Sequence, residues 1–261
     1  QGHIKEYDWG NSSFIPALLS QDEDGKSKAE LWFGTHPNGD AKVVETGQQL
    51  SEFLAQDSLH WFGQEHLDCF GDQLPLLLKV LAIDKPLSIQ VHPTKAQAEE
   101  GWAKEELTRD HQKKELWNYK DPNRKAEVIY ALTPITAMCG FRPLKQIIPM
   151  LKLLIPNGYA KHFGYLDTVQ EDSDKLLAKL FEDLYTMQSE HLVQLVDEYI
   201  ASLKKHEELP FATGDGAFLE SKGIVLSCYA AYPEDPGLFC PFILHVKHLH
   251  PGEALYLEPR T

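Results

Sequence analysis

The chain has 261 residues, of which 25 are lysine or arginine and 39 are aspartate or glutamate, so its formal net charge at pH 7 is −14. This balance argues against a nucleic-acid-binding protein, because a phosphate backbone is held by clustered basic side chains and the sequence contains no long basic stretch. Hydrophobic residues make up 43% and charged residues 25%, which are ordinary values for a globular protein with its own core.

The cysteines and the apolar segments indicate a cytoplasmic protein. The four cysteines are far apart and form no C-x-x-C pair, so the sequence contains neither a zinc-ribbon pattern nor a dense disulfide framework. No apolar stretch approaches the roughly 18 residues that a membrane span needs, and the N-terminal residues lack the apolar region of a signal peptide. We therefore expect a cytoplasmic location and no membrane partner.

The first half of the chain predicts short strands separated by turns, with two helices. Strand-like composition occurs within 30–36, 41–45, 87–92, 126–132 and 137–141. A helix is expected over 50–62. A second, highly charged helix is expected to begin at Lys95, with Thr94 as its N-cap, and to end near Leu107.

The second half begins with a helical hairpin. Apolar residues recur at helical spacing over 176–187 and again over 192–203, with Ser173 or Asp174 expected to cap the first helix and Ser189 the second. After Pro210, frequent glycine and proline residues favour a return to strands.

This order of elements predicts a mainly β protein with an α insert. Strands, then a helical hairpin, then strands favour an antiparallel barrel or sandwich over a βαβ fold. The expected divisions are a β-rich part with surface helices over 1–144, a helical insert over 145–210, and a return to the barrel over 211–261.

The segment 74–93 carries the most informative polar residues. Ser88, Gln90 and His92 alternate with apolar residues, so in a strand they would share one face. Taken alone, this pattern is most simply explained by a solvated strand face, because an isolated Q-x-H is a weak metal signal. Lys79 lies in an otherwise apolar run, where its ammonium must either reach solvent or meet an anion.

Lys125 and Glu127 form a second polar pair. They lie two residues apart at the start of an expected strand, hence on one face. Taken alone, the pair is most simply interpreted as exposed charges. Three histidines near the C-terminus, at 245, 248 and 250, are interpreted as part of a solvated strand and not as a metal site.

Six blocks of sequence together resemble type I mannose-6-phosphate isomerases, in the order in which that family carries them. The blocks are YDWG at 7–10, AELWFGTHP at 29–37, LPLLLKVLAIDKPLSIQVHP at 74–93, YKDPNRKAE at 119–127, ALTPITAMCGFRP at 131–143 and YPEDPGLFCPFILHVKHLHPGEALYL at 232–257. One block departs from the family, which usually continues with His-Lys-Pro-Glu where this chain has Arg124-Lys125-Ala126-Glu127. The lysine and the glutamate are kept.

The resemblance implies a cupin-type antiparallel β barrel (jelly roll) that carries a helical domain and binds one Zn²⁺ per chain. By position, Gln90, His92 and Glu127 correspond to three zinc ligands, a donor set suited to zinc and not to the two-histidine, one-carboxylate iron site of oxygenases. The family's fourth ligand is a histidine shortly after the strand that matches 253–257. We therefore expect that the barrel is incomplete at Thr261 and that this piece alone has little or no isomerase activity.

The resemblance also implies a reaction. Mannose 6-phosphate and fructose 6-phosphate would be interconverted through a cis-enediol, supplying activated-mannose (GDP-mannose) synthesis. Lys79, Ser88 and Trp9 are expected to bind substrate and Lys125 to act in catalysis, with a small phosphorylated sugar as the only partner of a monomer. Two alternatives remain open: a cupin that binds a sugar or metal without catalysis, and a metal-dependent cupin oxygenase.

Overall fold

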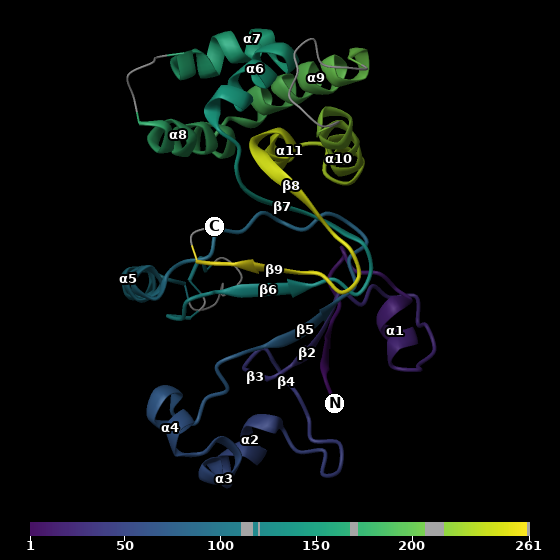
Figure 1. The fold of residues 1–261 in the computed structure, drawn as a ribbon, viewed down its shortest axis with the longest axis vertical. Coiled ribbons are helices and arrows are strands. Elements are labelled where there is room, and N and C mark those ends of the chain that lie inside the picture. The colour runs from purple at the N-terminus through teal and green to yellow at the C-terminus, as the bar shows by residue number, and fades with distance from the viewer. Residues whose placement is uncertain (111–116, 120, 168–171, 207–216, 260–261) are drawn as a thin grey trace. The chain divides into compact units, whose positions relative to one another are not determined.

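A computed structural model of the chain describes residues 1–110, 117–119, 121–167, 172–206 and 217–259 (Figure 1). Its contacts divide the chain into two units, Gln1–Leu87 and Ser88–Thr261. Within the described residues, none of the helices combines the length and the apolar character that crossing a bilayer would require.

A three-stranded antiparallel sheet forms the centre of the first unit, in the order β1 (His3–Lys5), β2 (Glu30–Phe33) and β5 (Leu78–Leu81). Alternate residues face opposite sides of such a sheet. Ile4, Leu31 and Val80 therefore share one face, where they pack with Ile15 of helix α1 (Phe14–Leu18) and form a small core. The opposite face carries Lys5, Glu30, Trp32 and Lys79, and we call it the polar face of the first sheet.

The rest of the first unit is built from short elements. These are β3 (Thr35–His36), β4 (Gly39–Asp40), α2 (Leu50–Ala55), α3 (Ser58–Phe62) and α4 (Gln64–Phe70). The helix expected over 50–62 is divided in two, because the Asp57 side chain accepts the backbone N–H of His60 and caps a new helix. The strand expected over 41–45 is wrong. Lys42 forms only an isolated bridge with Gln49.

The second unit contains two two-stranded antiparallel sheets. Strand β6 (Glu127–Tyr130) pairs with β9 (Ala254–Leu257), and β7 (Ile135–Phe141) pairs with β8 (Leu244–Leu249). The second pair is interrupted between Cys139 and Phe141, where Gly140 has a φ of 70° that favours glycine in such a bulge. Both strands expected from residues 126–141 are confirmed. The strand expected over 87–92 is wrong, since this stretch is irregular.

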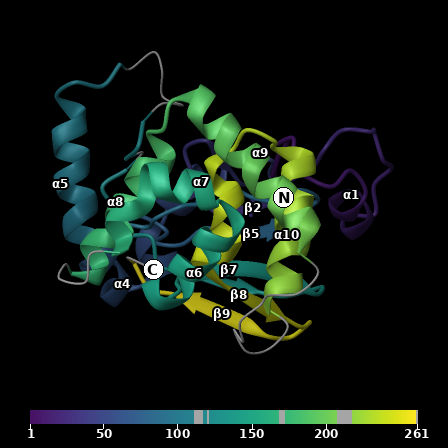
Figure 2. The same cartoon turned by 90° about the horizontal axis from the view of Figure 1, so that it is seen from above.

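Helix α5 (Lys95–Glu106) follows this stretch, and its beginning was predicted correctly. Thr94 and Gln97 cap it reciprocally: the Thr94 side chain accepts the Gln97 N–H, and the Gln97 side chain accepts the Thr94 N–H. Figures 1 and 2 show α5 outside the group formed by α6, α7, α9 and α10.

The main core of the second unit is helical. Its elements are α6 (Leu144–Leu154), α7 (Pro156–Gly158), a π-helical turn (Tyr159–Phe163), a 3₁₀ turn (Gly164–Asp167), α8 (Ser173–Tyr185), α9 (Ser189–Lys205), α10 (Ala217–Ala231), a second 3₁₀ turn (Pro236–Phe239) and α11 (Cys240–Ile243). The helical hairpin is confirmed as α8 and α9. Leu180, Tyr199 and Phe239 are fully buried there, and α11 packs against β7 and β8.

The caps of the hairpin differ from the expectation. Asp172 caps α8 by accepting the Asp174 N–H, and α9 follows Gln188 without a side-chain cap. Local capping signals place a helix start to within a residue or two, but neighbouring polar residues compete for the cap position.

The expectation of a mainly β chain is wrong. The described strands form one sheet of three strands and three sheets of two, and helices cover more residues than strands. Part of the error lies at α10, where strands were expected. Its sequence is apolar on most sides, so it shows no helical periodicity, and it contains Gly223, a residue that disfavours a helix interior. The division expected between residues 210 and 211 lies outside the described residues.

Candidate metal centre and substrate face

Three predicted metal ligands converge in the second unit. The Nε2 atom of His92 lies 3.3 Å from Oε1 of Gln90 and 3.5 Å from Oε1 of Glu127. We call Gln90, His92 and Glu127 the donor triad. The structure thus brings together one imidazole nitrogen, one amide oxygen and one carboxylate oxygen.

Two different local structures hold the donor triad. Gln90 and His92 lie in the irregular stretch just before the capping box of α5, so the cap fixes the backbone two residues after His92. Glu127 is the first residue of β6 and pairs across the sheet with Leu257 of β9. The site therefore joins a loop that ends in a helix to the beginning of a strand.

The geometry of the donor triad suits a zinc ion. For tetrahedral coordination at bond lengths of about 2.0–2.1 Å, adjacent ligand atoms lie about 3.3–3.4 Å apart. The two measured separations, 3.3 and 3.5 Å, are close to this edge length. Within the described residues, no three histidine, cysteine, aspartate or glutamate side chains are grouped as a metal site. The donor triad contains two side chains of these types and one amide.

The electrostatics of His92 favour the neutral imidazole that binds metals. Burial lowers the pKa of His92, the Glu127 carboxylate opposes this effect, and the Lys125 ammonium lowers the pKa further. The His92 side chain is only 12% exposed, whereas the Glu127 side chain is 51% exposed. The predicted catalytic residue Lys125 is therefore near enough to the donor triad to influence its protonation.

The predicted substrate-binding residue Lys79 lies in the first unit, on the polar face of its sheet. Its Nζ atom lies 3.3 Å from Oε2 of Glu30 and 4.6 Å from the centroid of the Trp32 ring. Trp32 pairs with Lys79 across β2 and β5, and its indole N–H donates to the Glu30 carboxylate. The ammonium thus satisfies the requirement for a partner through a carboxylate and an aromatic ring.

Trp9 contacts Tyr7, a residue on which the Glu30 carboxylate acts. Its ring stacks on Tyr7 with centroids 5.8 Å apart, and burial and the Glu30 carboxylate raise the pKa of Tyr7. The backbone N–H groups of Asp84 and Lys85 donate to the Trp9 carbonyl, which fixes its position in the unit. Trp9 is therefore connected to the Lys79 environment through Tyr7 and Glu30.

Ser88 and Glu30 show the limits of the sequence interpretation. Ser88 is exposed at the start of the second unit, and no described contact joins it to the donor triad. Glu30 was not identified from the sequence, although strand alternation would place it on the same face as Trp32. Its contact with Lys79 depends on the register between β2 and β5, which the sequence does not state.

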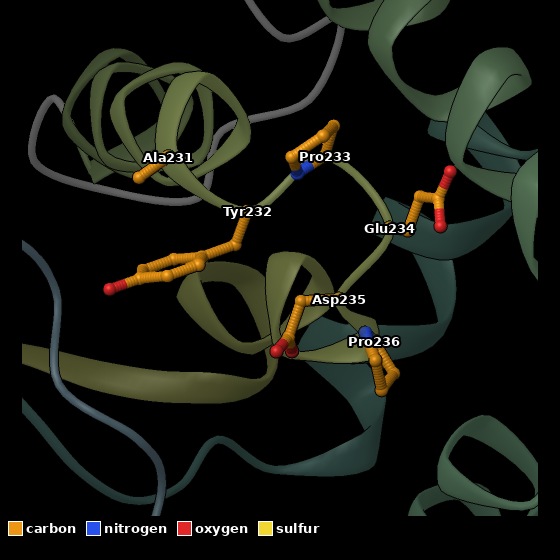
Figure 3. A pocket seen from close by; sticks show the side chains of 6 residues that line it. All are labelled: Ala231, Tyr232, Pro233, Glu234, Asp235 and Pro236. Carbon is orange, nitrogen blue, oxygen red and sulfur yellow. The ribbon is translucent and has the colours of Figure 1, made fainter. Parts of the chain in front are cut away.

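Two other features of the second unit differ from the donor triad. A hollow of about 390 Å³ is lined by six consecutive residues, 231–236, with two carboxylates and no basic side chain (Figure 3). In that view the Tyr232 and Glu234 side chains point to opposite sides of the turn and do not converge. His248 contacts Glu220 through Nε2 and Thr136 through Nδ1, so it links α10 to β7 and β8.

The chain is similar to known proteins over nearly its whole length. A family model described as phosphomannose isomerase type I, catalytic domain, matches residues 1–144, and one described as its helical insertion domain matches residues 154–244. Mannose-6-phosphate isomerase of Escherichia coli K12 is 32% identical over 99% of this chain, and the Homo sapiens enzyme is 36% identical over 98%.

Solved structures of phosphomannose isomerases are similar to this chain as well. A mannose 6-phosphate isomerase described as bound with zinc and yttrium has a TM-score of 0.83 and 31% identity, covering 98% of this chain and 62% of that one. The apo form from Salmonella typhimurium has a TM-score of 0.82 and 31% identity, with coverage of 98% and 61%. The chain spans 63% of the length of the Escherichia coli relative.

Proposed function

The chain belongs to the type I phosphomannose isomerase family, and on this premise we propose that the protein is a zinc-dependent mannose-6-phosphate isomerase. The reaction interconverts mannose 6-phosphate and fructose 6-phosphate through a cis-enediol and supplies activated-mannose (GDP-mannose) synthesis. The protein acts as a monomer on this small phosphorylated sugar. The observation that carries the proposal is the convergence of Gln90, His92 and Glu127 at separations that match a zinc coordination sphere.

The donor triad holds one zinc ion per chain in this proposal. When bound, the ion supplies Lewis-acid stabilisation of negative charge on the sugar oxygens. The neutral state of His92, favoured by burial and by Lys125, keeps Nε2 available as a ligand. Gln90 contributes an uncharged oxygen and Glu127 a charged one, so the three side chains together bring one negative charge to the site.

The fourth ligand is proposed to follow strand β9. The antiparallel register places Leu257, the last residue of β9, directly opposite Glu127. The backbone that continues past Leu257 therefore leaves the sheet at the Glu127 end. A histidine soon after this point in the longer protein would complete the coordination sphere, as the resemblance to the family implies.

Lys125 is proposed as a catalytic residue. A proton must move between C2 and C1 of the open-chain sugar, and negative charge develops on the adjacent oxygens as it moves. Lys125 precedes the ligand Glu127 by two residues and is near enough to lower the pKa of His92. Its ammonium can therefore donate a proton or stabilise the developing charge beside the donor triad.

Lys79, Trp9 and Ser88 are proposed as substrate-binding residues. Lys79 supplies a cation for the phosphate, and the Trp9 ring supplies an aromatic wall for the sugar. Ser88 supplies a hydroxyl for hydrogen bonding. The pair formed by Lys79 and Glu30 means that phosphate must compete with a carboxylate for the same ammonium.

A coupled assay of mannose 6-phosphate conversion on the longer natural protein, before and after zinc chelation, tests this proposal. We expect activity that is lost on chelation and restored by zinc. His92→Ala should lose zinc and activity together, while His250→Ala, which alters an exposed histidine, should keep both. Zinc binding without sugar conversion would instead identify a non-catalytic cupin, and oxygen consumption with iron would identify an oxygenase.

A further inference from the structure

The segment that leads to Lys125 and Glu127 is held by helix α5. Residues 117–119 and 121–126 form neither helix nor strand, so sheet pairing does not begin until Glu127. His92, the partner of Glu127 in the donor triad, lies just before the start of the same helix. Contacts between α5 and this segment therefore link the residues before Glu127 to the helix that follows His92.

Glu105, in the last turn of α5, makes three of these contacts. Its Oε1 atom accepts the backbone N–H of Asn118 at 3.0 Å, and its Oε2 atom accepts that of Tyr119 at 2.9 Å. The Asn118 side-chain amide adds a third bond, at 3.2 Å. Because these donors stabilise the charged carboxylate, they lower the pKa of Glu105.

Close packing reinforces this connection. A Cβ atom added at Gly101 would lie 2.2 Å from Cζ of Tyr119, so only glycine lets the tyrosine ring rest on the helix. Arg109 follows the helix, with its guanidinium 4.0 Å from the Trp102 ring centroid and 4.2 Å from that of Trp117. An Arg109 nitrogen also donates to the Tyr119 carbonyl at 3.4 Å.

The first turn of α5 holds the other end of the segment. The Lys95 ammonium donates to the Pro122 carbonyl at 3.1 Å and lies 3.4 Å from Oδ1 of Asn123. The backbone N–H of Lys125 lies 3.4 Å from the Pro93 carbonyl, one residue after His92. Both ends of the helix thus contact the chain that carries Lys125 and Glu127.

We propose that Glu105 is a positioning residue for the metal site: by holding residues 118 and 119 against α5, it fixes Glu127 relative to His92. The inference rests on the proposed zinc site and adds to it a residue that does not touch the ion. Residues outside a metal's ligand set that orient its ligands typically change metal affinity by about 10- to 100-fold when they are removed.

The zinc affinity of the longer natural protein tests this role, measured by competition with a chromogenic chelator at a temperature where circular dichroism shows every variant folded. We expect Glu105→Ala to weaken zinc binding about tenfold and to speed backbone amide exchange at Asn118 and Tyr119 in the metal-free chain. Glu105→Gln keeps one acceptor oxygen, so its zinc affinity should lie between those of the parent and of Glu105→Ala. The matched control is Glu100→Ala, since Glu100 pairs with Lys104 on the exposed surface of the same helix; it should change zinc affinity by less than about twofold.

A second variant tests the same contact without touching the carboxylate. Gly101→Ala raises the helix propensity of α5 but displaces the Tyr119 ring. Weaker zinc binding in this variant cannot come from a weakened helix, so it would support the positioning role. Parent-like zinc affinity in both Glu105→Ala and Gly101→Ala, with His92→Ala unable to bind zinc, would overturn the role and leave the zinc site intact. A parent form of the longer natural protein that binds no zinc would overturn both.

Discussion

The Lys79 ammonium and the Glu30 carboxylate lie 3.3 Å apart on the polar face of the first sheet. Glu30 is only 12% exposed, so its charge is poorly hydrated and Lys79 is its nearest compensation. A phosphate that binds Lys79 must therefore weaken this pair or share its cation.

Substitutions of Lys79 and of Glu30 should have opposite effects on phosphate binding. In the longer natural enzyme, Lys79→Ala should raise KM for mannose 6-phosphate by about 10- to 100-fold, since a charge-assisted hydrogen bond is worth roughly 1.5–3 kcal/mol. Glu30→Gln should lower the inhibition constant of inorganic phosphate, because it removes the competing carboxylate. Steady-state kinetics measure both, with Glu52→Gln on α2 as the control. Unchanged constants in Lys79→Ala would remove the phosphate role.

Lys125 should affect turnover more than binding. We expect Lys125→Ala to lower kcat by about 100-fold or more, within the usual range for general acid–base catalysis, with a smaller change in KM. The exposed Lys145, on α6, provides the control through Lys145→Ala. The kinetic constants of both variants at saturating zinc decide the matter. A Lys125→Ala enzyme with parent kcat would show that the lysine does not act in the chemical step.

Tyr199 carries a polar atom that the helical core does not satisfy. Its side chain is fully buried and stacks on Phe239 with centroids 4.5 Å apart, but its hydroxyl has no hydrogen-bond partner among the described residues. Tyr199→Phe should therefore raise the free energy of unfolding by about 1 kcal/mol. Tyr199→Ala should lower it by about 3–5 kcal/mol through loss of the ring.

Urea denaturation measures both Tyr199 variants. Tyr232→Phe serves as the control because Tyr232 is 38% exposed and its hydroxyl can bond to water. A loss of stability in Tyr199→Phe comparable to that of a removed hydrogen bond would mean that a buried partner satisfies the hydroxyl.

The ion pair and hydrogen bond of Asp167 should make part of the free energy of unfolding depend on pH in the acid range. The Lys152 ammonium, 2.7 Å away, and the Tyr159 hydroxyl, 3.1 Å away, hold the pKa of Asp167 below its ordinary value of 3.8. The Asp167 carboxylate therefore binds a proton more readily in the unfolded chain than in the folded one. Its contribution to the free energy of unfolding is fully present above pH 3.8, the ordinary pKa, and is lost as the pH falls through the lower pKa of the folded chain.

Asp167→Asn should therefore flatten the pH dependence of Tm at the acid end. Thermal unfolding followed from pH 6 down to about 3 tests this expectation. Asp197→Asn on α9 is the matched control. An Asp167→Asn chain that loses stability toward acid as steeply as the parent would contradict it.

Features encoded within a few residues were predictable from the sequence. The start of α5 follows from Thr94 and Gln97, whose mutual cap needs no distant partner. Gln90 and His92 were expected on one side because they alternate, and they do converge although no strand forms there. The hairpin of α8 and α9 was predicted because each helix has a single apolar face.

Features that depend on distant contacts were not predictable. Glu30 meets Lys79 only through the register of two strands far apart in sequence. Helix α10 has apolar residues on most sides, so periodicity could not separate it from strands. The contacts of Glu105 with Asn118 and Tyr119 join a helix to a loop, and no motif in the sequence marks them.

Two of the chain's five tryptophans enclose the Arg109 guanidinium, which gives the protein an optical reporter of its own. Trp102 belongs to α5, whereas Trp117 belongs to the segment that the helix holds. Any event that separates the two changes the polarity around both indole rings, and with it the wavelength and yield of their emission. Replacing the other three tryptophans, Trp9, Trp32 and Trp61, with phenylalanine would isolate this signal. Stopped-flow fluorescence would then follow the closing of the loop on the helix in real time, without a label.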